Sequence, residues 1–278
     1  MTVMPVDPIK FEVIRNALTQ AAEEMAIALR RSAYSTNVKT RQDFSCAFFD
    51  KNLRSVSQAF TQPVHLGSFV RHVPIAVKRY GPQNLAPGDM ILSNDPYGGG
   101  VHLNDISLIG PVHWRGRLVG YTACLAHHVD VGGGAPASVG AFREVFQEGI
   151  IIPPIKFVTQ GELDDDLFRL VLSQIRSKRE TAGDFRAQIA SNRTGAIRIN
   201  EIIEKRSLLT HPFYQAWNEG TLPVDSLKSY AAQYFHFEKA YPTFLSGIHH
   251  RCEDPEIRQH ILDNLWDEEH GEDNHVEL

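Results

Sequence analysis

The stretch DISLIGPVHWRGRLVGYTACLAHH, residues 105–128, decides the fold. It contains two runs of apolar and β-branched residues, 105–114 and 117–128, which Gly, Pro and Asn-Asp separate from their surroundings. The run MILSN at residues 90–94 has the same character. Such runs between turn-forming residues are typical of β-strands. We therefore expect the segment from residue 90 to residue 134 to form the strands of a sheet.

Helices and further strands are predicted on the amino-terminal side of this segment. Asp7-Pro8 places a capping carboxylate before a proline at the first helical position, and apolar residues then recur at helical spacing as far as Leu29. The runs FSCAFFD and LRSVSQA predict a hairpin that turns at residues 50–52, and a short helix is predicted from Pro74 to Tyr80.

On the carboxyl-terminal side, residues 131–148 are rich in glycine and small side chains and are interpreted as a long loop. An extended run follows at 150–158, and helices are predicted at 164–175 and 185–206. Residues 1–206 are thus predicted to form an α+β domain with a central β-sheet.

The character of the sequence changes after about Arg206. The strand-like runs stop, and histidines, aromatic residues and acids become dense with helical periodicity. Residues 263–278 hold seven acids and neither Lys nor Arg. We therefore predict a second domain at residues 207–278, an all-α helical segment.

Composition excludes several classes of protein. The 278 residues are 42% hydrophobic and 22% charged, a composition typical of a globular protein. The formal net charge is −5, so the chain lacks the basic surplus of a nucleic-acid-binding protein. Cys46, Cys124 and Cys252 form no CxxC pair, which favours a reducing compartment. We expect neither a signal peptide nor a membrane span, and therefore a cytoplasmic location.

A group of glycines and histidines carries the candidate chemistry. His102 and Asp105 lie three residues apart in NDPYGGGVHLNDISL, and His127 and His128 end the strand before a glycine turn. Strand alternation sends these last two side chains to opposite faces, so one of them is expected to join the first two. Two imidazoles and a carboxylate suit zinc, manganese or iron(II). A loop hydrogen bond between His102 and Asp105, with a structural His-His pair, is the alternative interpretation.

Seven motifs in order give residues 7–206 a resemblance to the amino-terminal part of the hydantoinase B/oxoprolinase family. They are DPIKFEVIRNAL, RQDFSCAFFD, QPVHLGS, NDPYGGGVHLNDISL, AHHVDVGG, FQEGIIIPP and GDFRAQIASNRTG. The family includes N-methylhydantoinases and 5-oxoprolinases, which hydrolyse cyclic amides at the expense of ATP, and related subunits of ketone carboxylases. The resemblance implies a divalent metal held by His102, Asp105 and His127.

The resemblance also implies a partner. The chain lacks a phosphate-binding loop of the GxxxxGK type, so ATP is expected to act through a hydantoinase A-like subunit of a hetero-oligomer. Around the metal, His128 and Asp130 are the candidate catalytic residues, and Asp130 is expected to orient an imidazole or to cap the turn before Gly132.

Residues 208–278 resemble the first helices of heme-oxygenase-like di-metal proteins, of the death-domain-associating and TENA/PqqC types. That resemblance implies a weaker second metal site at Glu268 and His275, which share a helix face at a seven-residue step. A solvated acidic helix end is the alternative interpretation.

Three functions follow from these resemblances. The first is the metal-dependent subunit of an ATP-dependent cyclic-amide hydrolase, or of a related ketone carboxylase, acting on a small cyclic amide or ketone. The second is part of a heme-oxygenase-like non-heme iron oxidase. The third is a chain without activity of its own.

Overall fold

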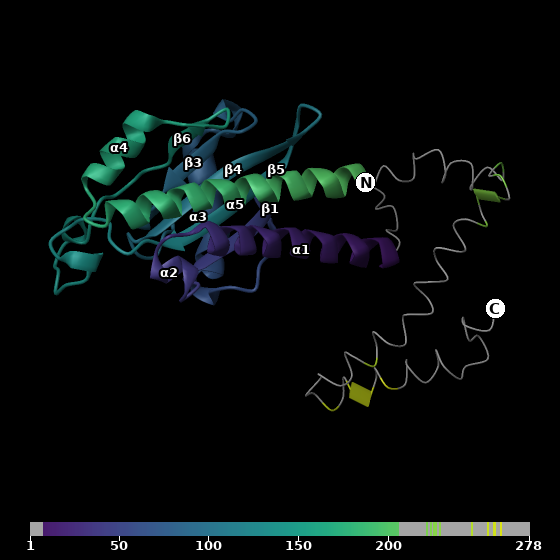
Figure 1. Ribbon diagram of the computed structural model, residues 1–278. Helices are drawn as coiled ribbons and strands as arrows, with labels where there is room; N and C mark the ends of the chain where they lie inside the picture. Colours follow the sequence, from purple (N-terminus) through teal and green to yellow (C-terminus); the bar gives the residue numbers. More distant parts are fainter. Residues whose placement is uncertain are drawn as a thin grey trace. The chain divides into compact units, whose positions relative to one another are not determined.

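The structure is a computed structural model that describes residues 8–205 and scattered positions between 221 and 262. Within the described residues, seven strands form one antiparallel sheet in the order β2-β1-β5-β4-β3-β6-β7 (Figure 1). The strands are β1 (Phe44–Asp50), β2 (Ser55–Gln58), β3 (Met90–Ser93), β4 (Asp105–Trp114), β5 (Arg117–His127), β6 (Ile155–Thr159) and β7 (Glu162–Leu163).

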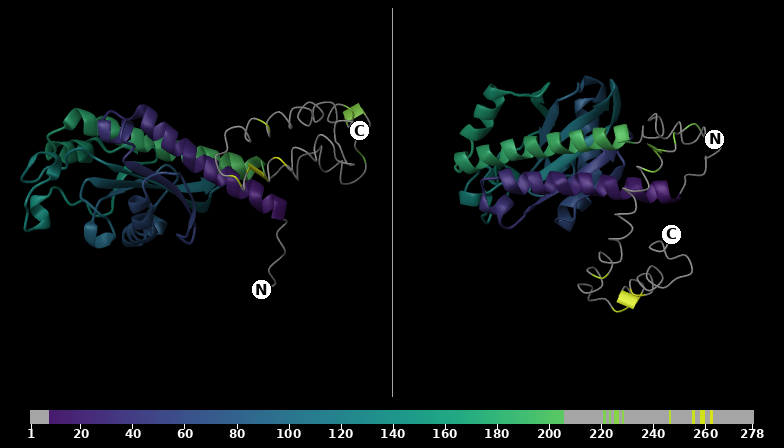
Figure 2. Two further views of the ribbon diagram at one scale, coloured as in Figure 1. Left: turned by 90° about the horizontal axis from the view of Figure 1, so that it is seen from below. Right: turned by 45° about the vertical axis from the view of Figure 1, so that its right-hand side comes forward.

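Two long helices cover one face of this sheet and a third covers the other. The α-helices are α1 (Pro8–Ser32), α2 (Thr36–Lys39), α3 (Pro63–Tyr80), α4 (Asp165–Ser173) and α5 (Lys178–Lys205). Helices α1 and α5 lie side by side on one face, whereas α3 packs against the opposite face, as the two views of Figure 2 show. The prediction of an α+β unit with a central β-sheet is confirmed.

Alternation along the central hairpin divides the core into two layers. Cys124 and Ala126 of β5 pack with residues of α1 and α5, whereas Ala123 and Leu125 pack with residues of α3. Successive strand side chains point to opposite faces, so a residue's position in β5 fixes the layer it enters. By this alternation His127 belongs to the α3 face and His128 to the face covered by α5.

The register of β4 and β5 positions the candidate site. Asp105, the first residue of β4, is the cross-strand partner of His127, the last residue of β5. Residues directly opposite each other in an antiparallel pair have Cβ atoms about 4.5–5.5 Å apart. The sheet therefore brings together a carboxylate and an imidazole that are 22 residues apart in the chain.

Two predicted helix starts are wrong, and the first is that of the helix expected at 185–206, which begins at Lys178. The helix expected at Pro74–Tyr80 begins at Pro63, and Pro74 lies inside it. Pro63 occupies the first helical turn, where proline costs no hydrogen bond, and Gln62 stands at the N-cap. Proline has no backbone N–H, so Pro74 cannot donate to the carbonyl of Val70 four residues earlier in the helix.

Contacts divide the chain into two compact units, Met1–Arg206 and Ser207–Leu278. The scattered described positions of the second unit are helical except for Thr221 and Pro223, as expected for an all-α segment. Glu268 and His275, the predicted second metal site, lie outside the described residues. Within the described part, no helix is both long enough and apolar enough to cross a membrane.

Candidate metal centre

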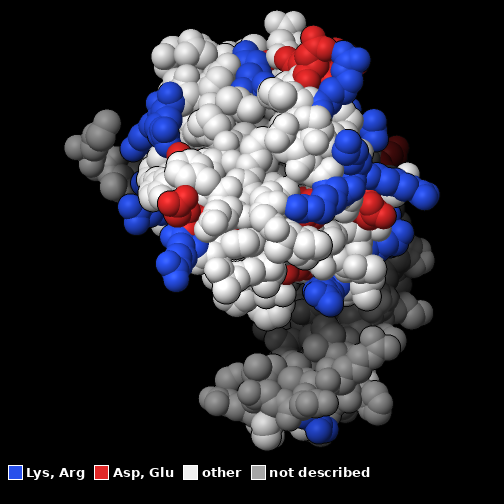
Figure 3. Space-filling view, turned by 90° about the vertical axis from the view of Figure 1, so that its left-hand side faces the viewer, with Lys and Arg blue, Asp and Glu red and all other residues white. Residues whose placement is uncertain are grey.

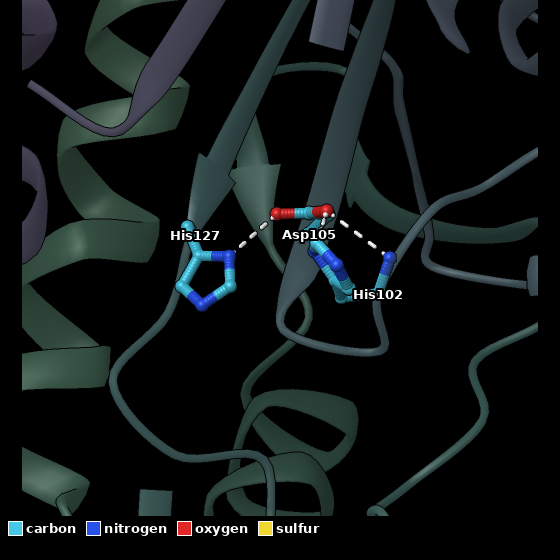
Figure 4. Close-up of side chains that lie close together, drawn as sticks. All are labelled: His102, Asp105 and His127. Atoms are coloured by element: carbon cyan, nitrogen blue, oxygen red, sulfur yellow. Dashed lines mark hydrogen bonds and ion pairs between the residues drawn. The ribbon is translucent and has the colours of Figure 1, made fainter. Parts of the chain in front are cut away.

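Asp105 is the centre of the site and is almost completely buried. Its Oδ1 lies 2.8 Å from Nδ1 of His127, and its Oδ2 lies 2.9 Å from Nδ1 of His102. The backbone N–H of His102 also donates to Oδ2, at 3.1 Å. Figure 4 shows the carboxylate between the two imidazoles, with each oxygen facing one ring.

The three side chains offer ligand atoms that all lie within 4.8 Å of one another. Ligands about 2.0–2.2 Å from one ion are ~2.8–3.1 Å apart when they subtend a right angle at the metal. The 2.8 and 2.9 Å distances from the carboxylate to the two imidazole nitrogens match that spacing, whereas the widest separation, up to 4.8 Å, must shorten slightly for one ion to reach all three residues. The predicted convergence of His102, Asp105 and His127 is therefore present in the structure, and the donor set fits a divalent ion.

Burial is graded across the three residues. The Asp105 side chain is fully buried, that of His127 is 25% exposed and that of His102 is 60% exposed. An ion at this position would therefore rest on a buried carboxylate and remain open to solvent on the His102 side. That open side is where a water molecule or a substrate would complete the coordination.

The electrostatics of the site favour a charged carboxylate. Burial raises the pKa of Asp105, but the hydrogen bond from His127 and the nearby His65 outweigh it and hold that pKa far below its usual range. Burial lowers the pKa of His127, but the hydrogen bond to Asp105 and its charge outweigh this effect and leave the pKa raised. Asp105 thus stays ionised despite its burial.

The loop that carries His102 is fixed by buried polar side chains. Asn94, which is fully buried, donates to the carbonyls of Leu103 and Ile150 and accepts from the backbone N–H of Ile152. Gly99 has a φ of +93°, and a Cβ there would lie 3.1 Å from the backbone nitrogen of His72. The glycines of NDPYGGG therefore let this loop turn tightly against α3.

Asn104 joins this loop to the end of β5. Its side-chain amide donates to the backbone carbonyl of His128 at 2.8 Å. The backbone carbonyl of Asn104 accepts from the backbone N–H of His128 at 2.9 Å. The backbone N–H of His127 donates to the carbonyl of Asp43. The two segments that supply the ligands are consequently tied to each other and to the start of β1.

The structure places His128 away from these three residues, as strand alternation predicts. Its ring is fully buried, its Nε2 lies 3.0 Å from Oε1 of Gln188, and it packs on Phe185 of α5. Burial lowers the pKa of His128. These surroundings suit a structural role, and the catalytic role stays a prediction.

Asp130 is bound to Arg176 rather than to an imidazole. Its carboxylate accepts from the backbone N–H and the guanidinium of Arg176, at 2.8 and 2.9 Å, and from the backbone N–H of Gly132. Arg176 also donates to the carbonyls of Gly132, Gly133 and Ala135. The arrangement agrees with the alternative interpretation, a carboxylate that holds the glycine turn.

Sequence reasoning missed two residues beside the site. Nε2 of His65 lies 3.5 Å from Oδ1 of Asp105 and 3.7 Å from Oδ1 of Asp43. Both residues occur in stretches that carry the family resemblance, RQDFSCAFFD and QPVHLGS. Neither residue has a sequence spacing that relates it to Asp105. Only their presence in these motifs could have indicated that they lie near the site.

Fold and donor set together define an α+β protein with a candidate mononuclear metal centre at the end of its central hairpin. The hydantoinase B/oxoprolinase family model matches residues 7–216, and the chain belongs to this family. A model of the TENA/THI-4/PQQC family matches residues 198–278. Both predicted resemblances are confirmed.

Similar proteins are found among several organisms. An uncharacterised protein of Methanocaldococcus jannaschii is 44% identical over 77% of this chain and 38% of its own length. A 5-oxoprolinase of Dictyostelium discoideum is 34% identical over 73% of this chain and 16% of its own length. The caprolactamase subunit beta of Pseudomonas jessenii is 33% identical over 72% of this chain and 34% of its own length. The chain thus spans less than two-fifths of the length of these relatives.

Solved structures give the same relationship. The ATP-dependent caprolactamase from Pseudomonas jessenii matches with a TM-score of 0.66 and 30% identity, over 87% of this chain and 39% of that chain. Acetone carboxylase in its nucleotide-free form matches with a TM-score of 0.68 at 20% identity, over 72% and 26%, which shows a shared fold.

Proposed function

We propose that the chain is the metal-binding part of an ATP-dependent hydrolase of small cyclic amides. The observation that carries the proposal is the convergence of His102, Asp105 and His127 within 4.8 Å in a member of this family. Relatives above 30% identity are a 5-oxoprolinase and a caprolactamase subunit, names that denote opening of a lactam ring. These names favour hydrolysis over ketone carboxylation.

His102, Asp105 and His127 would hold the divalent ion, with manganese, zinc and iron(II) as the candidates. When bound, the ion would polarise a carbonyl or lower the pKa of a water toward about 7. Asp105 supplies the negative charge that balances the ion, and its burial keeps that carboxylate away from competing water. His102 and His127 border the open side, where the substrate would lie.

ATP would enter through a partner. The chain has no GxxxxGK loop, and one relative is named a subunit beta, which supports a complex with a hydantoinase A-like subunit. The partner would phosphorylate the amide oxygen, and the activated ring would reach the metal centre of this chain.

The test is reconstitution of the reaction. The full chain is incubated with an A-type subunit, ATP, Mn²⁺ or Zn²⁺, and in turn 5-oxoproline, hydantoin and caprolactam, and ring-opened product is measured by mass spectrometry. We expect product only when both proteins are present, and none with Asp105→Ala. Turnover by the chain alone, or equal turnover by the variant, would refute the proposal.

A further inference from the structure

His65 lies next to Asp105, on the α3 side of the sheet. It lies in the first turn of α3 and only 2% of its side chain is exposed. Its Nε2 is 3.5 Å from Oδ1 of Asp105, the oxygen that also faces His127, and 3.7 Å from Oδ1 of Asp43. The buried imidazole thus lies close to two carboxylates, one fully buried and one partly exposed.

The proton of a neutral His65 ring has one favourable position. The other ring nitrogen, Nδ1, is buried without a hydrogen-bond partner among the described residues. A proton on Nδ1 would leave a buried donor unsatisfied and turn the Nε2 lone pair toward two carboxylate oxygens. A proton on Nε2 instead points at both carboxylates and leaves only an acceptor lone pair unused.

We infer that His65 is a positioning residue that fixes the Asp105 carboxylate for metal binding, with Nε2–H directed at Oδ1. The 3.5 Å separation lies at the outer limit of hydrogen-bond distances. His65 would then restrain Oδ1 from a buried position, whereas the side chains of His102 and His127 are partly exposed. Partners of this kind orient metal ligands, and losing one typically costs about 10–100-fold in metal affinity.

The inference rests on the proposed metal centre, so the experiment separates the two. Zn²⁺ and Mn²⁺ affinities of the full chain are measured by competition calorimetry for wild type, His65→Leu and His65→Gln. The Gln amide can replace the Nε2–H donor, whereas Leu cannot. His113→Leu is the control, because His113 lies on β4 with Asp105, at the far end, and its Nδ1 is also buried without a described partner.

We expect His65→Leu to lose about 10–100-fold in affinity, and His65→Gln and the control to bind like wild type. Wild-type affinity of a folded His65→Leu protein would overturn the inference. A metal-free crystal structure of the same variant gives a second, independent reading. An Asp105 carboxylate that has left its 2.8 Å contact with His127 supports the inference, and an unmoved carboxylate refutes it.

Failure of the proposed function looks different. If wild type binds neither metal, the metal centre is wrong. The crystal structure then still decides whether His65 positions Asp105.

Discussion

At the scale of single residues, the buried carboxylate of Asp105 organises the site. The carboxylate is hydrogen-bonded to two imidazoles and one backbone N–H, and these hydrogen bonds compensate for its burial away from water. The convergence of His102 and Asp105 with one histidine at the end of the strand could be predicted from local signals, a three-residue step and strand alternation. The family resemblance selected His127 as that histidine. His65 and Asp43 could not be predicted, because only the packing of α3 and β1 on the central hairpin brings His65 to Asp105 and Asp43 to His65.

Removal of one ligand should abolish metal retention without unfolding the chain. His127 is at the end of β5, and its side chain is partly exposed, so His127→Ala leaves no large cavity in the core. We expect a loss of metal affinity beyond the ~10–100-fold typical of residues that only orient ligands. Metal content after purification is measured by elemental mass spectrometry, and helical content by circular dichroism. Retention of metal by a folded variant would remove His127 from the ligand set.

A second buried carboxylate, Asp89, should control stability in acid. Burial raises its pKa, but hydrogen bonds from Lys156 and from the backbone N–H groups of Gln160 and Ala86 outweigh burial and leave the pKa lowered. A lowered pKa stabilises the fold above the unfolded value of about 3.9, and this contribution is lost as the pH falls through the folded pKa.

Asp89→Asn should therefore destabilise the protein by about 2 kcal/mol at pH 7 and by less at pH 3. Urea unfolding at the two pH values measures both differences. Asp166→Asn is the control, because the Asp166 side chain is 92% exposed. Its charge contributes only through the first turn of α4 and an exposed pair with Arg169, so the variant should lose no more than about 1 kcal/mol at pH 7. An equal loss for Asp89→Asn at both pH values would contradict the assigned ion pair.

At the scale of elements, the hydrophobic pattern predicted whether a segment is a helix or a strand better than it predicted where the segment begins and ends. The central hairpin, the hairpin of β1 and β2 and the long helices α1 and α5 follow from alternation or helical spacing that extends over many residues. The start of α3 did not follow, because Pro63 and Pro74 are both compatible with a first helical turn. Only the packing of Phe69 and the following apolar residues against the sheet shows that the helix continues through Pro74.

Close contact between α5 and its neighbours should make Gly195 intolerant of a side chain. A Cβ at this position would lie 2.4 Å from Sδ of Met25 and 2.8 Å from Cγ2 of Thr122. We expect Gly195→Ala to lose about 1–3 kcal/mol, the usual cost of overpacking a core.

The matched control is Gly67→Ala in α3, where a Cβ meets nothing within 4 Å. It should gain about 0.5–1 kcal/mol, because alanine loses less backbone entropy in a helix. Thermal unfolding of both variants measures the contrast. A Gly195→Ala protein as stable as Gly67→Ala would show that α1 and α5 are less closely packed than described.

At the scale of the whole molecule, charge is unevenly distributed along the chain. Residues 1–206 contain 24 Lys and Arg against 20 Asp and Glu, whereas residues 207–278 contain 4 against 13. Figure 3 shows the face of the first unit on the side where α4 lies in Figure 1, with more Lys and Arg than Asp and Glu on it. The excess of negative charge in the whole chain thus comes from the second unit, which matches a different family.

The first unit should therefore fold and bind metal without the second. The ligands and the described contacts that fix them, from Asp43 and His65 to Asn94, lie within residues 8–205. Contacts also separate Met1–Arg206 from Ser207–Leu278. A chain ending at Arg206 should retain the Zn²⁺ affinity of the full chain and unfold in one cooperative transition.

Calorimetry and urea unfolding of the two chains provide the measurement. The shorter chain should have a smaller m-value where both units unfold together in the full chain, because less surface is then exposed. The Asp105→Ala variant of the shorter chain is the control for specific metal binding. An unfolded or aggregated 1–206 chain, or one that folds but has lost the metal, would show that residues 207–278 complete the domain or its site.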